Sequence, residues 1–185
     1  TGGSGAETIS AGSENDTINA AGGADVILIP EIPFTYDSIC AKISEREAKG
    51  KYFTLVVVAE GAKEKGGGFV TNAAQEANRE ARLGGIGNVV AEEVGKRSGK
   101  ETRCCVLGHL QRGGSPTTFD RVLCSMYGAM AMELIAAGDF GKMVAFTGKG
   151  IGAVNISDAV GKLKTVILDG GMARTARALG ISLGD

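Results

Sequence analysis

The sequence has 185 residues, of which 43% are hydrophobic, and its formal net charge is −1. These values suit one domain with a core, with or without an appendage. The balanced charge gives no general attraction to nucleic acid or anionic membranes, and the aromatic content of 5% offers no platform for stacking bases. No apolar run approaches the roughly 20 residues that a membrane span needs. We therefore expect neither nucleic acid nor a membrane as a partner.

The four cysteines, Cys40, Cys104, Cys105 and Cys124, have no CxxC spacing, and the chain contains one histidine. Zinc sites need several such ligands at short, regular spacings, so this pattern argues against bound zinc. Free cysteines are usually buried and stay reduced in the cytosol. The sequence therefore predicts reduced, mostly buried thiols in a cytoplasmic protein.

The first 41 residues contain six acidic and no basic side chains, and they begin with a nine-residue repeat. The three units are GGSGAETIS, AGSENDTIN and AAGGADVIL, each with an acid at the sixth position and Ile at the eighth. The pattern resembles the calcium-binding nonapeptide of RTX proteins. In those repeats, carboxylate and carbonyl oxygens from successive turns surround Ca²⁺, which prefers oxygen ligands.

Two interpretations of residues 1–19 stay open: a calcium-binding repeat, or a flexible, Gly-rich acidic leader without metal. Glu7 replaces the expected Asp, and Glu14 replaces a Gly. Stacked repeats also need neighbours for stability, and there are at most three units here. We therefore expect a leader over residues 1–19 that is foreign to the rest of the chain, followed by one unit over residues 20–185.

Three elements are predicted between residues 24 and 62. The continuous apolar run ADVILIPE, closed by Pro30, is typical of a buried parallel strand. Residues 36–49 place apolar side chains on one helical face and charges on the other, which predicts an amphipathic helix ending at Gly50. Residues 52–62, YFTLVVVAEGA, predict a second buried strand that ends at Glu60.

Helices and strands continue to alternate through the rest of the chain. We expect helices at 73–82 and 88–97, a third strand at 101–109, a long apolar helix entered at Ser115–Pro116, a fourth strand at 142–150, a short helix after Asn155 and a last helix near 171–179. This alternation predicts an α/β fold with a parallel-type sheet and flanking helices.

Polar groups follow two of the predicted strands. Glu60 ends the second strand, and His109, the only histidine, ends the third. Since the carboxyl ends of parallel strands meet at one edge, where such sheets bind ligands, we expect both at one site. Arg103 and Arg112 can form forked hydrogen bonds to phosphate oxygens, and His109 can donate to phosphate or to a sugar hydroxyl.

The same loop has further features that suit an anion. Gly113 and Gly114 let backbone N–H groups come close to a ligand, and the following helix has a positive N-terminus. Glu60 suits sugar hydroxyls rather than phosphate. Together these groups predict a sugar-phosphate site. The alternative is a structural histidine beside surface arginines and a simple turn.

The stretch RCCVLGHLQRGGSPTTFDR, residues 103–121, closely resembles the signature of 6-phosphofructokinases. That signature has a basic residue, four residues, Gly-His, then Gln-Arg-Gly-Gly and, after five more residues, Asp-Arg, and every position is matched. Residues 22–34, 49–62 and 119–135 also resemble this family, in the same order. The resemblance covers residues 20–185 and implies a partial phosphofructokinase-like fold.

The resemblance also implies roles for individual residues. Side chains of Arg103, His109 and Arg112 would bind the 6-phosphate and sugar of fructose 6-phosphate, with the backbone of Leu110 and Gln111 in the same loop, and Glu60 would hold a sugar hydroxyl. In the family, the arginine matching Arg103 reaches into a neighbouring subunit's site. We therefore expect a homo-oligomer.

An effector site is implied by analogy with the allosteric bacterial enzymes. In those proteins, lysines matching Lys49 and Lys51 bind a nucleotide effector. Phe53 stands where a histidine is expected shortly after them. This difference argues against effector control in the present chain.

The family's phosphoryl-donor half is missing from the sequence. Its Gly-Gly and Gly-Gly-Asp-Gly loops, its Thr-Ile-Asp segment with the catalytic base, and a Met-Gly-Arg segment expected before residue 20 have no match here. Those segments serve Mg²⁺ with ATP or pyrophosphate, so we identify no catalytic base and no metal ligand in this chain. Phosphoryl transfer depends on positioning and charge neutralisation at the donor. We therefore expect a phosphofructokinase piece that is inactive alone, with the choice of donor open.

Three alternatives to this interpretation remain. One is a non-catalytic sugar-phosphate-binding or regulatory module, and another is a calcium-binding repeat protein. The third is a truncated or chimeric gene product with its seam near residues 16–21, which the abrupt change in charge favours over a natural fusion.

Overall fold

The computed structural model describes residues 5–11, for which it gives the backbone, and residues 23–70, 85–108, 110, 113–148, 150–161 and 165–185. The chain divides into two compact units. We call residues 1–112 with 165–185 the sheet unit, and residues 113–164 the hairpin unit. The helix predicted at 73–82 lies outside the described residues.

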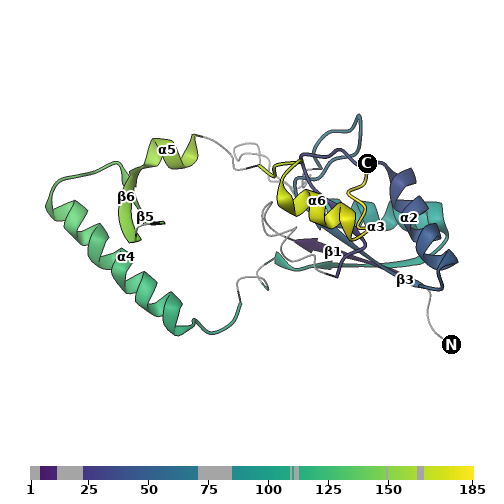
Figure 1. The fold of residues 1–185 in the computed structure, drawn as a ribbon, viewed down its shortest axis with the longest axis horizontal. Helices are drawn as coiled ribbons and strands as arrows, with labels where there is room; N and C mark the ends of the chain where they lie inside the picture. The colour runs from purple at the N-terminus through teal and green to yellow at the C-terminus, as the bar shows by residue number, and fades with distance from the viewer. Residues whose placement is uncertain are drawn as a thin grey trace, which may run out of the picture. The chain divides into compact units, whose positions relative to one another are not determined.

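A parallel four-stranded sheet is the centre of the sheet unit (Figure 1). Its strands, in spatial order, are β2 (Val26–Leu28), β3 (Phe53–Ala59), β1 (Gly5–Ala11) and β4 (Glu101–Val106). All three pairings are parallel, as the alternation of strands and helices predicted. The three strands that the sequence analysis predicted here are confirmed.

Strand β1 was not predicted. Its residues belong to the Gly-rich opening segment, yet their backbone pairs with β3 on one side and with β4 on the other. The pairing is physically reasonable, because β3 and β4 each present an edge of backbone N–H and C=O groups that needs partners. The short run Thr8-Ile9 supplies β-branched residues that favour a strand.

Two helices, α2 (Tyr36–Ala48) and α3 (Ile86–Ser98), cover one face of the sheet. Thr35 caps α2, since its Oγ1 accepts a hydrogen bond from Ser38 N at 3.2 Å. The chain leaves α2 through Gly50, whose φ of 75° suits glycine, as predicted. The third helix of this unit, α6 (Gly171–Ala178), packs on the opposite face.

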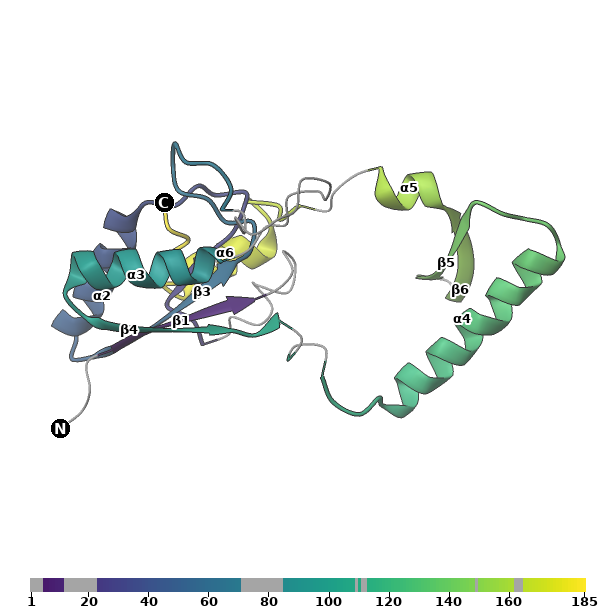
Figure 2. The ribbon, with the colours of Figure 1, turned by 180° about the vertical axis from the view of Figure 1, so that it is seen from behind.

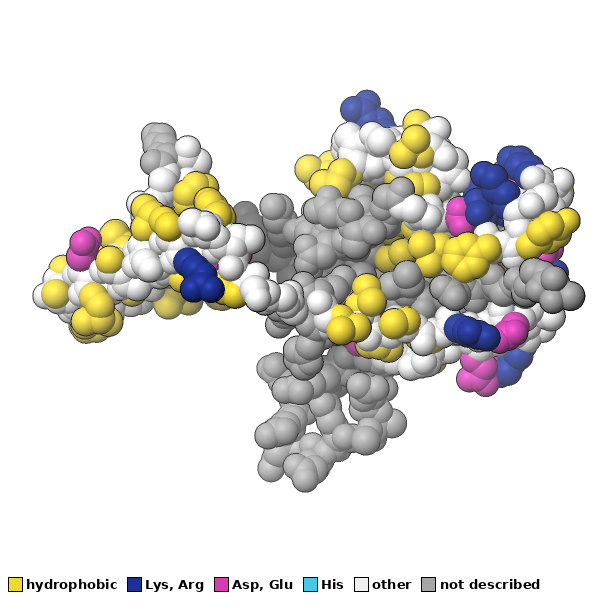
Figure 3. Space-filling view, turned by 90° about the horizontal axis from the view of Figure 1, so that it is seen from below, with side chains coloured by type: hydrophobic (Ala, Val, Ile, Leu, Met, Phe, Trp, Pro, Cys, Tyr) yellow, Lys and Arg dark blue, Asp and Glu magenta, His cyan; other side chains and the backbone are white. Residues whose placement is uncertain are grey.

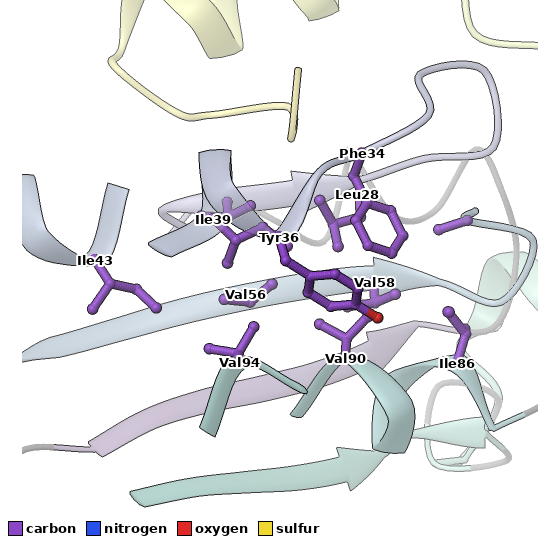
Figure 4. Close-up of a cluster of buried hydrophobic side chains, with 12 residues drawn as sticks. Leu28, Phe34, Tyr36, Ile39, Ile43, Val56, Val58, Ile86, Val90 and Val94 are labelled. Carbon is purple, nitrogen blue, oxygen red and sulfur yellow. The ribbon is translucent and has the colours of Figure 1, made fainter. Parts of the chain in front are cut away.

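The core has two layers because the strands are buried on both faces. Val26, Leu28, Val56 and Val58 face α2 and α3, where they meet Ile39, Ile43, Val90 and Val94 (Figure 4). The intervening residues Ile27, Ile29 and Val57 pack against Ala173 and Ala176 of α6. Each fully buried aliphatic side chain contributes about 1.5–3 kcal/mol, so this α/β/α arrangement stabilises the sheet unit.

The hairpin unit contains α4 (Thr118–Ala136), β5 (Lys142–Thr147), β6 (Gly150–Asn155) and α5 (Ile156–Val160) (Figure 2). The strand predicted at 142–150 is present as β5, but the expected parallel pairing was wrong. Strand β5 pairs antiparallel with β6, and Thr147 lies opposite Gly150. A connection of two residues can join only antiparallel strands, whereas a parallel pair needs a long crossover.

The described residues of the hairpin unit include none that is buried. Figure 3 shows hydrophobic side chains on the surface of this unit. The large apolar side chains exposed on α4, β5 and α5 are Phe119, Val122, Met126, Met132, Ile135, Met143, Phe146, Ile156 and Val160. No helix in the described part of the chain is long and apolar enough to cross a membrane.

The prediction of mostly buried cysteines was wrong, since none of the four is fully buried. Cys105 and Cys124 are exposed, while Cys40 and Cys104 are half-buried, and all four are free thiols. Partial burial raises the pKa of the Cys40 and Cys104 thiols, because it disfavours the thiolate.

Candidate functional site

The carboxyl ends of β3 and β4 lie at the same edge of the sheet. In the register of the sheet, Ala59 at the end of β3 is opposite Ala11, and Val106 at the end of β4 is opposite Ser10. Glu60 and the loop that begins at Leu107 therefore leave the sheet at one edge, as predicted. Strand β1 lies between them, so the two features are not on adjacent strands.

Glu60 is held in place by its neighbours. Ala59 and Ala62 on either side are fully buried, and Ala62 N donates a hydrogen bond to Ala59 O at 2.9 Å. This turn anchors the backbone at the end of β3. The Glu60 residue itself is half-buried. A carboxylate on a fixed, partly exposed turn can accept hydrogen bonds from hydroxyl groups of a ligand.

Arg103 lies in the middle of β4, and its side chain is 74% exposed. Its guanidinium forms an ion pair with Glu101, with Nη2 at 2.9 Å and Nε at 3.1 Å from Oε1. The two residues are two positions apart, so they share one face of the strand. An exposed ion pair of this kind stabilises the protein little and can be exchanged for another anion.

The loop after β4 is described only in part. His109, Gln111 and Arg112 lie outside the described residues. Leu110 is 72% exposed, and its backbone N–H donates to Leu107 O at 2.7 Å. Gly108 adopts a φ of 43°, a left-handed conformation that suits glycine. The Leu110 amide is therefore engaged within the loop.

The N-terminus of α4 differs from the prediction. Thr117, rather than Ser115, is the N-cap, and it forms a capping box with Asp120. Thr117 Oγ1 accepts a hydrogen bond from Asp120 N at 3.2 Å, and Asp120 Oδ2 accepts one from Thr117 N at 2.7 Å. The hydrogen bonds from the Thr117 side chain and backbone lower the pKa of Asp120.

This cap reduces the value of α4 as an anion site. The first turn already contains a carboxylate, which competes with a phosphate for the exposed N–H groups and opposes it by charge. The Thr-Thr-Phe-Asp stretch at residues 117–120 has the spacing of a capping box, so the sequence contained the signal that we missed.

A second polar site lies in the sheet unit beside α2. It is an open pocket of about 180 Å³ with four cationic and two acidic side chains in its lining. The lining residues are Ala24, Asp25, Lys42, Glu45, Arg46, Lys49, Lys51, Leu179, Gly180 and Ile181. Both lysines of the implied effector site, Lys49 and Lys51, are among them, whereas Phe53 is not.

Most of the cations in this pocket already have an acidic partner. Glu45 accepts from Lys42 Nζ at 2.9 Å and from Lys49 Nζ at 2.5 Å. These lysines, Lys49 foremost, lower the pKa of Glu45 to about 2. Arg46 forms an ion pair with Asp25. Lys51 has no ion pair within the described part of the chain, so it is the cation most available to a bound anion.

Asp25 has a structural role. Besides the ion pair with Arg46, its Oδ2 accepts a hydrogen bond from Leu55 N at 2.9 Å. Asp25 is the acid of the third nine-residue unit, the position that would bind Ca²⁺ in an RTX repeat. Both carboxylate oxygens of Asp25 form contacts within the fold, so this acid of the third unit stabilises the sheet unit rather than binding a metal.

Comparison with family models gives two matches. A model described as "Phosphofructokinase" matches residues 17–135. A model described as "RTX calcium-binding nonapeptide repeat (4 copies)" matches residues 1–28. The two matches overlap at the third repeat unit.

Similar curated proteins include two kinds of phosphotransferase. The chain is 49% identical over 164 residues to "ATP-dependent 6-phosphofructokinase 1" of Synechocystis sp., a match that covers 89% of this chain and 45% of the relative. It is 46% identical over 147 residues to "Pyrophosphate--fructose 6-phosphate 1-phosphotransferase" of Amycolatopsis methanolica, which covers 79% and 43%. The chain therefore spans less than half the length of these relatives.

Solved structures agree with this assignment. A crystal structure of Pichia pastoris phosphofructokinase in the T-state gives a TM-score of 0.60 at 26% identity, covering 98% of this chain and 20% of that one. A pyrophosphate-dependent phosphofructokinase from Nitrosospira multiformis shares the fold with a TM-score of 0.64 at 19% identity, covering 97% and 48%. Since the family match takes in most of the chain, including both strand ends at the candidate site, the chain belongs to the phosphofructokinase family.

Proposed function

We propose that this chain is the part of a 6-phosphofructokinase that holds fructose 6-phosphate. The observation that supports the proposal most is that β3, which ends before Glu60, and β4, which ends before Leu107, have their carboxyl ends at one edge of a parallel sheet, inside the family match. At this edge, His109 and Arg112 would bind the 6-phosphate and the sugar. Glu60 would accept a hydrogen bond from a sugar hydroxyl, and the Leu110 and Gln111 backbone would line the same loop.

We also infer that Arg103 acts in a neighbouring subunit of a homo-oligomer. Its side chain is on an exposed strand face and forms an exposed ion pair with Glu101, a carboxylate that a phosphate could replace. The site would then be complete only after assembly.

The complete reaction transfers a phosphoryl group from ATP or pyrophosphate to the 1-hydroxyl of fructose 6-phosphate, as the names of the relatives indicate for those proteins. Mg²⁺ would neutralise charge on the donor. The described residues contain no cluster of three or more carboxylate, thiol or imidazole groups that could hold a metal ion. We therefore assign this chain the binding of the acceptor sugar, without turnover by the chain alone.

Isothermal titration with fructose 6-phosphate tests the binding role. We expect binding by the unmodified chain, and at least about tenfold weaker binding by Glu60→Gln and Arg112→Ala, since a hydrogen bond to a charged group contributes about 1.5–3 kcal/mol. Glu64→Gln, a change at an exposed acid after the same strand, is the matched control and should bind normally. Absence of binding by the unmodified chain would refute the proposal.

A coupled assay with fructose 6-phosphate and either ATP or pyrophosphate tests the second part. We expect no turnover above the background rate. Normal turnover would show that the chain contains its own donor site. Binding without turnover is also the result expected of a regulatory module, so the two are separated by adding the missing half of a relative, which should restore activity only for an enzyme fragment.

An anion-binding role for the pocket beside α2 is a second proposal. It rests on the four cations in the lining, of which Lys51 lacks an acidic partner in the described residues. We expect Lys51→Ala to weaken the binding of a nucleoside diphosphate. Glu45→Gln should strengthen it, because the change releases Lys42 and Lys49. Unchanged affinity in both variants would remove this proposal.

A calcium-binding role has the family match over residues 1–28 in its favour and the engagement of Asp25 against it. Far-UV circular dichroism with and without Ca²⁺ tests whether residues 1–28 bind calcium. We expect no calcium-dependent change.

A further inference from the structure

Strand β1 has an unusual combination of origin and position. Its residues, Gly5–Ala11, lie before residue 17, where the phosphofructokinase match begins. They nevertheless form an inner strand of the sheet, paired along their whole length with β3 and over six residues with β4 (Figure 2). A segment outside the family match thus completes a sheet whose other strands are all inside it.

Helix α3 contacts the strands on both sides of β1. Helix α3 packs on β3 through Ile86, Val90 and Val94, which join the core cluster of Val56 and Val58. The same helix holds β4, because Thr102 Oγ1 donates a hydrogen bond to Ala91 O at 2.8 Å.

Helix α3 is also in close contact with β4 at Gly95, where an added Cβ would lie 3.0 Å from Thr102 Oγ1. The helix therefore bridges β3 and β4 and sets the distance between them. That distance leaves room for one strand, and β3 and β4 do not pair with each other.

Some strand must occupy this groove in any phosphofructokinase that keeps β3, α3 and β4. Without it, two facing rows of backbone N–H and C=O groups beneath a helix would lack partners, which is costly. The family match does not include residues 5–11, so we expect other residues to supply this strand in the relatives. The part of the relatives that this chain does not span is more than half their length.

We propose that the groove between β3 and β4 is a strand-accepting interface for phosphofructokinase polypeptide that this chain does not span, and that residues 5–11 occupy it as a substitute. The partner is an extended segment of about seven residues that runs parallel to β3 and β4, the mode of recognition in which a peptide adds a strand to a sheet. The proposal rests on the proposed function, since it takes the partner from the same family.

The burial of β3 indicates the chemistry of this segment. Val56 and Val58 are buried on one face of β3, and Val57 is buried on the other. A strand next to it is favoured by apolar, β-branched side chains on both faces. The present occupant, GAETISA, contains Glu7, Thr8 and Ser10. An apolar strand should therefore displace β1.

Peptide binding to the full chain tests this proposal. The probe is a fluorescein-labelled 12-residue peptide copied from the Synechocystis relative, ending where its match to this chain begins. Thr8→Pro should empty the groove, because proline removes a ladder N–H and is not tolerated in an inner strand. We expect the peptide to bind Thr8→Pro at least tenfold more tightly than the unmodified chain, in which it competes with β1.

The control peptide has proline at its centre and should bind neither protein. Failure of the relative's peptide to bind a folded Thr8→Pro chain would overturn the proposal. If Thr8→Pro does not fold, hydrogen exchange on the unmodified chain decides instead. The amides of residues 6–11 should be protected, and the peptide should abolish that protection while β3 and β4 stay protected.

Unprotected amides over residues 6–11, or protection that the peptide leaves unchanged, would overturn the proposal. Fructose 6-phosphate binding is measured on the same samples. If the peptide exchanges with β1 but fructose 6-phosphate does not bind, the proposed function is contradicted. If fructose 6-phosphate binds but the peptide does not exchange with β1, only the strand-accepting groove is contradicted.

Discussion

Glu31 Oε1 accepts a hydrogen bond from the backbone N–H of Val166 at 2.7 Å. This contact attaches the returning C-terminal segment of the sheet unit to the turn after β2. The other oxygen, Oε2, is buried and has no hydrogen-bond partner within the described part of the chain. Oε1 of Glu31 therefore stabilises the fold through its hydrogen bond. Oε2 destabilises it, because a buried acceptor without a donor loses its hydration.

Two substitutions separate these contributions. Glu31→Ala removes the acceptor of the Val166 amide and should lower the free energy of unfolding by about 1–3 kcal/mol. Glu31→Gln keeps a carbonyl acceptor and removes the charge, so it should leave stability within about 0.5 kcal/mol of the unmodified chain. Urea denaturation measures both values. Equal losses in the two variants would contradict this account.

The ion pair between Arg46 and Asp25 should contribute to stability more than the exposed pairs do. The two side chains are only 17% and 13% exposed, and Asp25 also accepts from Leu55 N. Arg46→Met would leave Asp25 as a largely buried, uncompensated charge, at a cost of about 3 kcal/mol.

The matched control for this prediction is Lys96→Met on α3. Lys96 pairs with Glu92 at an exposed position, so its loss should cost much less stability than the loss of Arg46. Thermal unfolding of both variants gives the comparison. Similar costs at the two sites would mean that burial does not govern the Arg46 pair.

Gly184 should tolerate no side chain. Its φ is 85°, and an added Cβ would lie 2.6 Å from Phe34 Cβ and 2.7 Å from Leu28 Cδ2. Gly184→Ala therefore combines backbone strain with overlap in the core, and we expect a loss of about 2 kcal/mol or more.

Gly180→Ala is the control for the strain alone. Gly180 has a φ of 78°, and nothing lies within 4 Å of the position of its added Cβ. The cost should be about 1 kcal/mol. The difference between the two variants in denaturant midpoints measures the overlap, and a smaller loss in Gly184→Ala would contradict the packing described here.

The capping box of α4 predicts a specific response to acid. The pKa of Asp120 is lowered by its hydrogen bonds with Thr117. A lowered pKa in the folded state means that the cap contributes fully above the unfolded value, near pH 4, and is lost as pH falls through the lower folded value. Helicity measured by far-UV circular dichroism should therefore decrease in this range.

Asp120→Asn should remove that pH dependence, because its amide has no proton to gain. Thr117→Ala should lower the stability of the helix by about 1 kcal/mol at neutral pH. A decrease of helicity in Asp120→Asn equal to that of the unmodified chain would assign the acid effect to other groups.

The exposed apolar side chains of α4 predict self-association. At 100° per residue, Phe119, Val122 and Met126 lie on one face of the helix, whereas Met132 and Ile135 lie on the opposite face. A helix that is apolar all round is typical of a buried position.

In the absence of another partner, we expect further copies of this chain to cover these faces, so that light scattering gives a mass above 18.8 kDa. Met132→Lys with Ile135→Lys should shift the protein toward the monomer. Ser44→Lys with Ala48→Lys adds the same charge to an exposed part of α2 and should have no such effect. A monomeric unmodified chain would contradict this prediction.

Much of the sheet unit could be predicted because its signals are local. The apolar runs of β2 and β3, the amphipathic pattern of α2 and the Gly50 stop all lie within short windows. The pairing of β5 with β6 could also have been inferred, because a two-residue connection excludes a parallel pair. The sequence analysis missed it because GIGAVN, with two glycines in six residues, has no clear strand pattern.

The candidate site was predictable at its edge rather than in its details. Glu60 and the loop after β4 follow apolar strands, and parallel strands place their carboxyl ends together. The strand between them could not be predicted, because Thr8 and Ile9 are the only β-branched residues of GAETISA and its pairing comes from β3 and β4. Such pairing is a tertiary effect that no local pattern encodes.

The central position of β1 also has a kinetic consequence. Its partners begin at Phe53 and Glu101, so two long loops must close before the middle of the sheet can form. Pairings between residues so far apart in sequence slow folding. We therefore expect a folding intermediate in which β3 and β4 pack against α3 before β1 pairs with them. The unpaired edges of β3 and β4 would be prone to aggregation in this intermediate.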